Sequence, residues 1–403
     1  MGSGVLVVRV YADNIAQPVA GAIVEVLNEE NGASVQTDLE GMTAQITLSA
    51  PDVQYSLQAQ NEVVPYAEYR IRVSKSGLVP KVINGVQIFA DQIAYQDVFL
   101  ESVDETTQQE QQLDIPNVPV GGNPPKIPEN PVKPEARVLP FVVIPEYIIV
   151  HDGLPTNSNA ANYSVPFPDY VKNVASSEIY STWPRETIKA NVYAIASFTL
   201  NRVFTEWYVS QGYNFTITAS TQYDQKYIHG RTIFESISSV VDEVFRTYIK
   251  RQGMVQPFLA QYSDGINVNR PNWLSQWGSK DLGDKGYQAL QILQYYYGNS
   301  VYLAQADQVQ GLPSSFPGYN LSLGACGEEV QKLQNELNVI RGSYPGIPVV
   351  TNPDGNFTEQ TKSAVETFQS VFKLPVTGVV DYATWYKISY IFVAVSKMLQ
   401  GIT

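Results

Sequence analysis

The sequence predicts an α+β protein of several domains: an N-terminal β-sandwich, a mixed α/β middle domain and a C-terminal three-helix bundle. Apolar and polar residues alternate with a period of two through much of residues 1–103, as strands do. Apolar residues recur instead at helical spacing after Pro184 and again after Glu328. Prolines accumulate between the β-like and helical parts, and a chain of 403 residues is long enough for several domains.

The first predicted domain, residues 1–103, contains short strand-like runs separated by turn residues. Two segments are distinctive: residues 18–22, Pro-Val-Ala-Gly-Ala, and residues 37–41, Thr-Asp-Leu-Glu-Gly. They resemble the transthyretin-like, carboxypeptidase-regulatory family of β-sandwiches. That resemblance implies a structural or adhesive domain without chemistry of its own, through which the protein could form homo-oligomers.

Residues 104–140 read as a linker. Their first part is polar and glutamine-rich, and prolines are frequent from Pro116 to Pro140. Such a composition favours extended polyproline geometry over a packed core. We expect this segment to space the sandwich from the middle domain or to wrap over a surface.

The middle domain, residues 141–310, is expected to begin with strands at residues 141–144 and 147–150. A long helix should begin near Pro184, because proline is well tolerated at a helix start. Two further helices are expected, through residues 233–245 and 287–297, where apolar residues recur at helical spacing.

Charge and cysteine content exclude several classes of function. The net charge of −13 argues against nucleic acid and anionic membranes as partners, since both need basic patches. The single cysteine, Cys326, excludes an internal disulfide and a cysteine-based zinc site. We expect no metal and no cofactor. No stretch has the apolar length of a membrane span, and the N-terminus lacks the features of a signal peptide.

The C-terminal segment, residues 318–403, contains an ordered series of motif positions. An acidic helix start at Glu328-Glu329, a second helix after Thr358 and a third after Asp381 are expected. Leu323-Gly324, Leu333-Gln334, Asp354-Gly355-Asn356-Phe357, Phe368-Gln369 and Thr384-Trp385 follow one another in the chain. The series resembles the small three-helix peptidoglycan-binding domain of many cell-wall enzymes. It implies peptidoglycan glycan strands as a partner, while the spacing alone equally fits a bundle without a ligand.

Residues 174–194 form the densest motif of the middle domain and contain Ser177-Glu178 and Trp183-Pro184. Together with Ser275-Gln276-Trp277-Gly278 and the aromatic run ending at Gly298, this motif resembles the stage II sporulation protein D family. Characterised members are lytic transglycosylases that act on peptidoglycan glycan strands. The resemblance implies that Glu178 is the catalytic acid. It also implies substrate-binding residues, for which the candidates are Trp183, Asp224, Ser275, Gln276 and Trp277.

A lytic transglycosylase can work with one carboxyl group, because the sugar's own hydroxyl attacks the anomeric carbon after the acid protonates the glycosidic oxygen. Burial would have to keep Glu178 protonated, and the neighbouring Tyr180 and Trp183 could supply that environment. A structural glutamate just before the helix is the alternative. Active relatives also have a His-Gly pair before the Ser-Gln element, whereas residues 269–273 here contain no histidine.

Three functions therefore stay open from the sequence. The first is a peptidoglycan lytic transglycosylase, and the second is a peptidoglycan-binding protein whose middle domain is a non-catalytic platform. The third is a structural protein of the envelope that self-associates. The resemblances place the protein in the spore envelope, the cortex or the cell wall of an endospore-forming bacterium, made in the mother cell.

Overall fold

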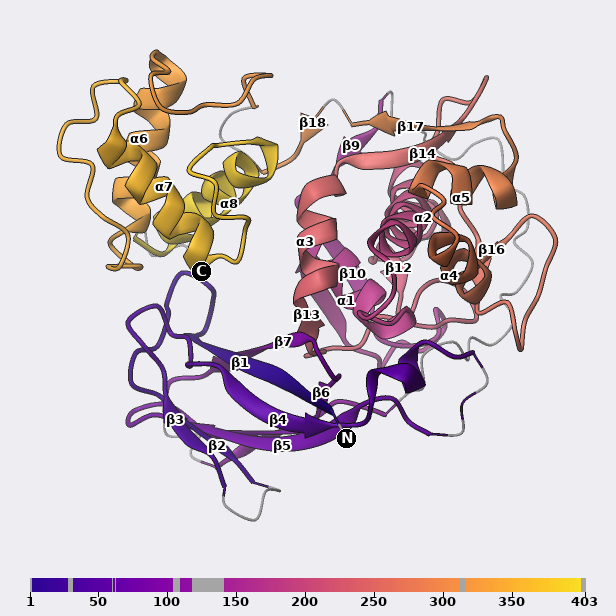
Figure 1. Ribbon diagram of the computed structural model, residues 1–403, viewed down its shortest axis with the longest axis horizontal. Coiled ribbons are helices and arrows are strands. Elements are labelled where there is room, and N and C mark those ends of the chain that lie inside the picture. Colours follow the sequence, from indigo (N-terminus) through magenta and orange to yellow (C-terminus); the bar gives the residue numbers. More distant parts are fainter. Residues whose placement is uncertain are drawn as a thin grey trace.

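The computed structural model shows the predicted α+β architecture, with two sheets at one end and helices over the rest (Figure 1). In the described part of the chain, no helix is long and apolar enough to cross a bilayer. The structure describes residues 2–27, 32–59, 61, 63–103, 109–117, 141–306, 308–311 and 316–399.

The N-terminal part contains a four-stranded and a five-stranded sheet. The first has the order β13-β7-β1-β4 and the second the order β3-β2-β5-β6-β8. Burial alternates along the strands, as in β4, so that one face of each sheet contributes to the core. The strands of the first sheet are β1 (Gly2–Ala12), β4 (Ile46–Ala50), β7 (Ile93–Leu100) and β13 (Ile233–Phe234). Those of the second are β2 (Ile23–Val26), β3 (Ser34–Gln36), β5 (Ala67–Ser74), β6 (Lys81–Ile88) and β8 (Gln111–Asp114).

Two of these strands come from outside the expected sandwich. β8 lies within the expected linker but pairs in parallel with β6. β13 belongs to the middle domain and pairs antiparallel with β7, with Ile233 opposite Tyr95. Residues 104–108 and 118–140 of the expected linker lie outside the described residues. The sheets and the middle domain consequently share one hydrophobic core.

The middle domain is built around α2 (Arg185–Phe204), a helix buried on almost every face. It begins directly after Pro184, as expected from the sequence. The helices around it are α1 (Phe167–Glu178), α3 (Glu235–Val244), α4 (Gln276–Asp284) and α5 (Ala289–Tyr297). Its strands are β9 (Val143–Ile144), β10 (Tyr147–His151), β11 (Asn162–Pro166), β12 (Ile217–Thr218), β14 (Thr247–Arg251), β15 (Tyr262–Ser263), β16 (Leu274–Ser275), β17 (Val301–Gln305) and β18 (Gln308–Val309). Two 3₁₀ turns complete the elements, η1 (Val53–Ser56) in the sheet region and η2 (Val209–Gln211) here.

Helix α1 was not expected from the sequence. It is buried on nearly all sides, and the buried residues include Asn173, Ser176 and Ser177. A helix surrounded by protein needs no single apolar stripe, so helical periodicity does not reveal it. Glu178 is therefore the last residue of one helix rather than a residue just before the next.

The C-terminal domain consists of α6 (Glu328–Ile340), α7 (Glu359–Val371) and α8 (Tyr382–Leu399), which pack around a second core. The three helices begin where the sequence predicts. Asp381 lies directly before α8, and its Oδ1 accepts a hydrogen bond from the backbone N–H of Thr384 at 2.9 Å. Thr358 occupies the N-cap position of α7, but its side chain makes no capping hydrogen bond.

The C-terminal domain contacts both other parts of the molecule (Figure 1). On the middle domain, the Phe245 ring lies 4.3 Å from that of Tyr386, between ring centroids. On the sheet region, Glu40 Oε1 accepts a hydrogen bond from the Gly346 N–H at 2.8 Å. Ala16, from the loop after β1, is buried in the core of the C-terminal domain.

Candidate functional site

The C-terminal domain is held in shape by two buried glutamines that fix the turns before its helices. Gln334, on α6, donates from Nε2 to Asn356 O at 2.8 Å and accepts at Oε1 from the Gly355 N–H at 3.0 Å. Gly355 has a φ of +84°, which is accessible to glycine at little cost. The side chain thus satisfies both a donor and an acceptor of the turn that leads into α7.

Gln369, on α7, makes equivalent hydrogen bonds with the turn at residues 377–379, which leads into α8. Its Oε1 accepts from the N–H groups of Thr377 and Gly378, both at 2.9 Å, and its Nε2 donates to Val379 O at 2.9 Å. Both glutamines are buried, with 1% exposure. These contacts explain why Leu-Gln and Phe-Gln pairs precede each turn in the sequence, and they give the domain a rigid framework.

Glu178 ends α1 and is 1% exposed. Its Oε1 accepts a hydrogen bond from the Lys226 backbone N–H at 2.8 Å, and its Oε2 accepts from Gln276 Nε2 at 3.4 Å. The structure thus brings Glu178 and Gln276 together. Both side chains are buried.

Lys226 and Tyr262 also interact with Glu178, and neither was singled out from the sequence. Burial lowers the pKa of the Lys226 ammonium to about 8, and the charge of Glu178 opposes that shift. Burial and then the charge of Glu178 raise the pKa of Tyr262 well above its ordinary value. Lys226 lies in an irregular segment after the turn at residues 221–223, and Tyr262 lies in β15, where no sequence pattern marks them. A cation and hydrogen-bond donors around a carboxyl group favour its ionised form.

Trp183 and Trp277 form an aromatic cluster with Tyr180. The two indole rings lie 4.9 Å apart between centroids, and Tyr180 contacts both. The Nε1 of Trp183 donates to Ser56 O in η1 at 3.1 Å, so that the sheet region covers this side of the cluster. Trp183 is 4% exposed and Trp277 is 8% exposed.

Ser275 is used as a helix cap. Its Oγ accepts a hydrogen bond from the Gly278 N–H at 2.9 Å at the start of α4. Gly265 lies so close that an added Cβ would meet this Oγ at 1.8 Å. The single glycine of the Tyr262–Gly265 segment is therefore needed for close packing against the Ser-Gln element.

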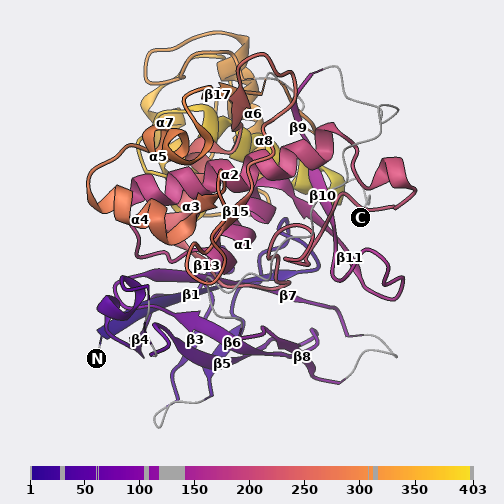
Figure 2. The ribbon, with the colours of Figure 1, turned by 90° about the vertical axis from the view of Figure 1, so that its right-hand side faces the viewer.

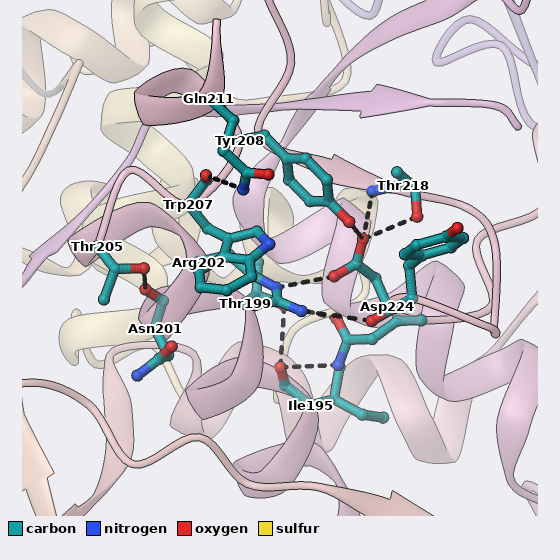
Figure 3. A network of polar contacts seen from close by, with 12 residues as sticks. Ile195, Thr199, Asn201, Arg202, Thr205, Trp207, Tyr208, Gln211, Thr218 and Asp224 are labelled. Atoms are coloured by element: carbon teal, nitrogen blue, oxygen red, sulfur yellow. Dashed lines mark hydrogen bonds and ion pairs between the residues drawn. The ribbon is translucent and has the colours of Figure 1, made fainter. Parts of the chain in front are cut away.

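Asp224 lies in a separate buried network (Figure 3). Its Oδ1 accepts from Arg202 Nε at 2.8 Å. Its Oδ2 accepts from the Tyr208 hydroxyl at 2.6 Å and from the N–H and hydroxyl of Thr218 at 3.0 and 2.7 Å. Asp224 is 0% exposed, so both oxygens are engaged within the protein. In this conformation Asp224 presents no oxygen to a glycan.

A cleft of about 460 Å³ opens beside the aromatic cluster, between the sheet region and the middle domain. Tyr180 and Trp277 contribute to its wall, whereas Glu178 does not. Asp264 lines it too, but its carboxylate is occupied by three backbone N–H groups of the following loop and by the Asn267 amide. Among the described residues, no group of three or more His, Cys, Asp or Glu side chains is arranged to hold a metal ion.

Comparison with known proteins gives a match for the C-terminal domain. Residues 326–388 match the family described as "Putative peptidoglycan binding domain". A curated relative, the zinc D-Ala-D-Ala carboxypeptidase of Streptomyces albus G, is 40% identical over 68 residues, which are 17% of this chain. This chain spans only 25% of the length of that relative.

Solved structures give partial matches. The SleB N-terminal domain is 31% identical, and the match covers 19% of this chain and 99% of that one, with a TM-score of 0.17. The Bacillus anthracis TIE protein is 18% identical over 25% of this chain and 17% of its own, with a TM-score of 0.18. The family match over residues 326–388, rather than these structures, identifies the C-terminal domain as similar to peptidoglycan-binding domains.

Proposed function

We propose that this protein binds peptidoglycan in the bacterial cell wall or spore cortex, and that its C-terminal domain provides the attachment. The observation that carries the proposal is the family match over residues 326–388, a segment that forms α6, α7 and the first part of α8. The domain has its own hydrophobic core and internally braced turns, so it presents a preformed surface to a rigid polymer.

Binding to insoluble peptidoglycan tests this proposal. The full chain should sediment with purified wall material, whereas a chain ending at residue 311 should stay in the supernatant. The net charge of −13 excludes general charge attraction to an anionic wall, so we expect recovery to change little between about 0.05 and 0.5 M salt. Equal sedimentation of the two chains would overturn the assignment of attachment to the C-terminal domain.

For the middle domain we propose a non-catalytic platform of the sporulation protein D type. A general acid must be protonated and must reach the glycosidic oxygen. Glu178 does not line the cleft, and the hydrogen-bond donors on both of its carboxyl oxygens and the Lys226 cation beside it stabilise a carboxylate there. Lytic transglycosylase activity through Glu178 is the second candidate, and the adjoining aromatic-walled cleft of about 460 Å³ favours it.

The N-terminal sheets would then serve as a structural domain of the transthyretin-like type. Their pairing with β13 fixes them to the platform, which fits a scaffold better than a freely moving adhesive domain. We propose a place in the spore envelope, the cortex or the cell wall, with self-association through the sheets. Light scattering at increasing protein concentration tests the self-association.

A further inference from the structure

A second cleft lies where all three domains meet, and Glu178 does not line it. Its volume is about 480 Å³, within the range of small-molecule sites. β1 and β7 contribute Arg9 and Phe99, the middle domain contributes Tyr163 and Arg231, and α8 contributes Lys387. Only the assembled chain forms this cleft, since residues from each domain are needed.

The cleft is basic in an acidic protein. Five lysine or arginine side chains line it, against two aspartates, whereas the whole chain has a net charge of −13. Arg9 is neutralised by a two-point contact with Asp97, at 2.5 and 2.7 Å. Lys172 is neutralised by Asp242, outside the lining, at 2.7 Å.

Three cations remain, and none of them forms an ion pair within the described part of the chain: Lys81, Arg231 and Lys387. Arg231 is the most buried, at 4% exposure. Its Nε and Nη2 donate to Ser176 O at 3.3 and 2.8 Å, while its buried Nη1 meets no hydrogen-bond partner among the described residues. Burial lowers its pKa to about 10. A buried cation with an unused donor is costly unless an anion completes its contacts.

The two lysines are less enclosed. Lys81 donates from Nζ to Phe99 O at 2.7 Å, and burial lowers its pKa. The Nζ of Lys387 lies 5.7 Å from the centre of the Tyr390 ring, and burial, followed by the neighbouring charge of Lys172, lowers its pKa. The remaining lining carboxylate, Asp169, forms no ion pair with the described residues. Asp169 opposes an anionic ligand, but the three unpaired cations outnumber it, so a bound anion would still offset an excess of positive charge.

Aromatic side chains provide the rest of the wall. The Tyr163 ring stacks on the His229 imidazole at 4.0 Å between centroids, and Tyr11 stacks on Phe99 at 5.4 Å. All four line the cleft. Stacked rings present broad apolar surfaces edged by polar groups, which suit the C–H face of a sugar ring.

We propose that this junction cleft binds a carboxylated amino sugar, the chemistry of the muramic acid unit of peptidoglycan. The carboxylate would lie toward Lys387 and Arg231, and the ring against the aromatic wall. The proposal rests on the proposed peptidoglycan-binding function and adds a second ligand site, whose lining does not include Glu178. Since α8 supplies Lys387, occupancy would also stabilise the docking of the C-terminal domain.

Calorimetric titration of the full chain tests the proposal with two sugars that differ only in the O3-linked lactyl group, which carries the carboxylate. N-acetylmuramic acid should bind at least about tenfold more tightly than N-acetylglucosamine, as expected for a charge-assisted contact. Lys387→Gln should weaken N-acetylmuramic acid binding about tenfold, and Lys81→Gln should also weaken it. Lys397→Gln, on the same helix but outside this cleft, should change it less than about twofold.

Equal affinity for the two sugars, equal effects of Lys387→Gln and Lys397→Gln, or equally tight binding of inorganic phosphate would each overturn the proposal. Sedimentation with wall material separates it from the proposed function. If the full chain sediments but N-acetylmuramic acid does not bind, the cleft proposal alone fails. If N-acetylmuramic acid binds but the chain does not sediment, wall attachment alone fails.

Discussion

The indole Nε1 of Trp183 donates a buried hydrogen bond to the backbone carbonyl oxygen of Ser56, 3.1 Å away. The two residues are separated by 127 positions and lie on opposite sides of the boundary between the sheets and the middle domain. Beside this contact, Ser56 Oγ and Thr182 Oγ1 lie 2.7 Å apart. Figure 2 shows the sheets extending beneath the helices of the middle domain, so the two parts form a single structural unit.

Trp183→Phe should destabilise the protein by about 1–3 kcal/mol, because it leaves the Ser56 carbonyl without its donor in a buried position. Urea unfolding followed by circular dichroism measures the loss. Trp273→Phe is the control, since Trp273 is half-buried and contacts the Arg270 guanidinium at 5.1 Å. Equal destabilisation by the two variants would show that the Trp183–Ser56 contact has no special role.

A chain cut by protease between residues 104 and 140 should remain one particle. The proline-rich composition predicts cleavage in that segment first. The two fragments should stay together through the β7–β13 pairing and the shared core. Size-exclusion chromatography of the nicked protein under native conditions measures this, and elution as two separate fragments would contradict the single core.

Asp224→Asn should destabilise the protein by about 3–5 kcal/mol, because Arg202 would keep its charge in a buried site without its counter-ion. The matched control is Glu243→Gln, which removes the partner of Arg185 from an ion pair whose side chains are 52% and 44% exposed. Such exposed pairs contribute about 0–1 kcal/mol. The difference between the two variants in free energy of unfolding measures the cost of leaving a buried charge without its counter-ion. Similar values for the two variants would contradict this expected cost.

Stability should rise with pH between about 8 and 10 through Lys226. Its pKa in the folded protein is about 8, below the ordinary value of 10.5. In this interval the unfolded chain binds more protons at this site, so raising the pH favours the folded state. Urea midpoints of the wild type and Lys226→Met across this interval provide the test. The variant should have a less positive slope, and equal slopes would contradict the assignment.

Glu178→Gln distinguishes the platform from the enzyme. For a platform, neither wild type nor variant releases anhydro-muropeptides from purified walls, sedimentation is unchanged and the variant loses stability. If wild type releases such products and the variant lowers their rate by about two to four orders of magnitude, Glu178 is the general acid and the platform proposal fails. Mass spectrometry of the soluble products provides the measurement.

The sequence alone determined the local elements that are marked by apolar periodicity or by a residue with special backbone geometry, such as proline or glycine. Helical spacing and helix-start residues predicted α6, α7 and α8, and Pro184 marked the start of α2. Turn glycines such as Gly355 and Gly378 were identifiable because both need a positive φ. The match over residues 326–388 likewise depends on a short ordered motif that is read directly from the chain.

Only the tertiary structure decided which of these elements meet. β13 completes a sheet whose other strands end more than a hundred residues earlier, and Asp224 is paired with Arg202 rather than lining a groove. Glu178 is buried among Lys226, Tyr262 and Gln276, and the basic cleft combines residues as distant as Arg9 and Lys387. Periodicity reports which face of an element is apolar, but burial and charge pairing depend on neighbours brought together by the fold.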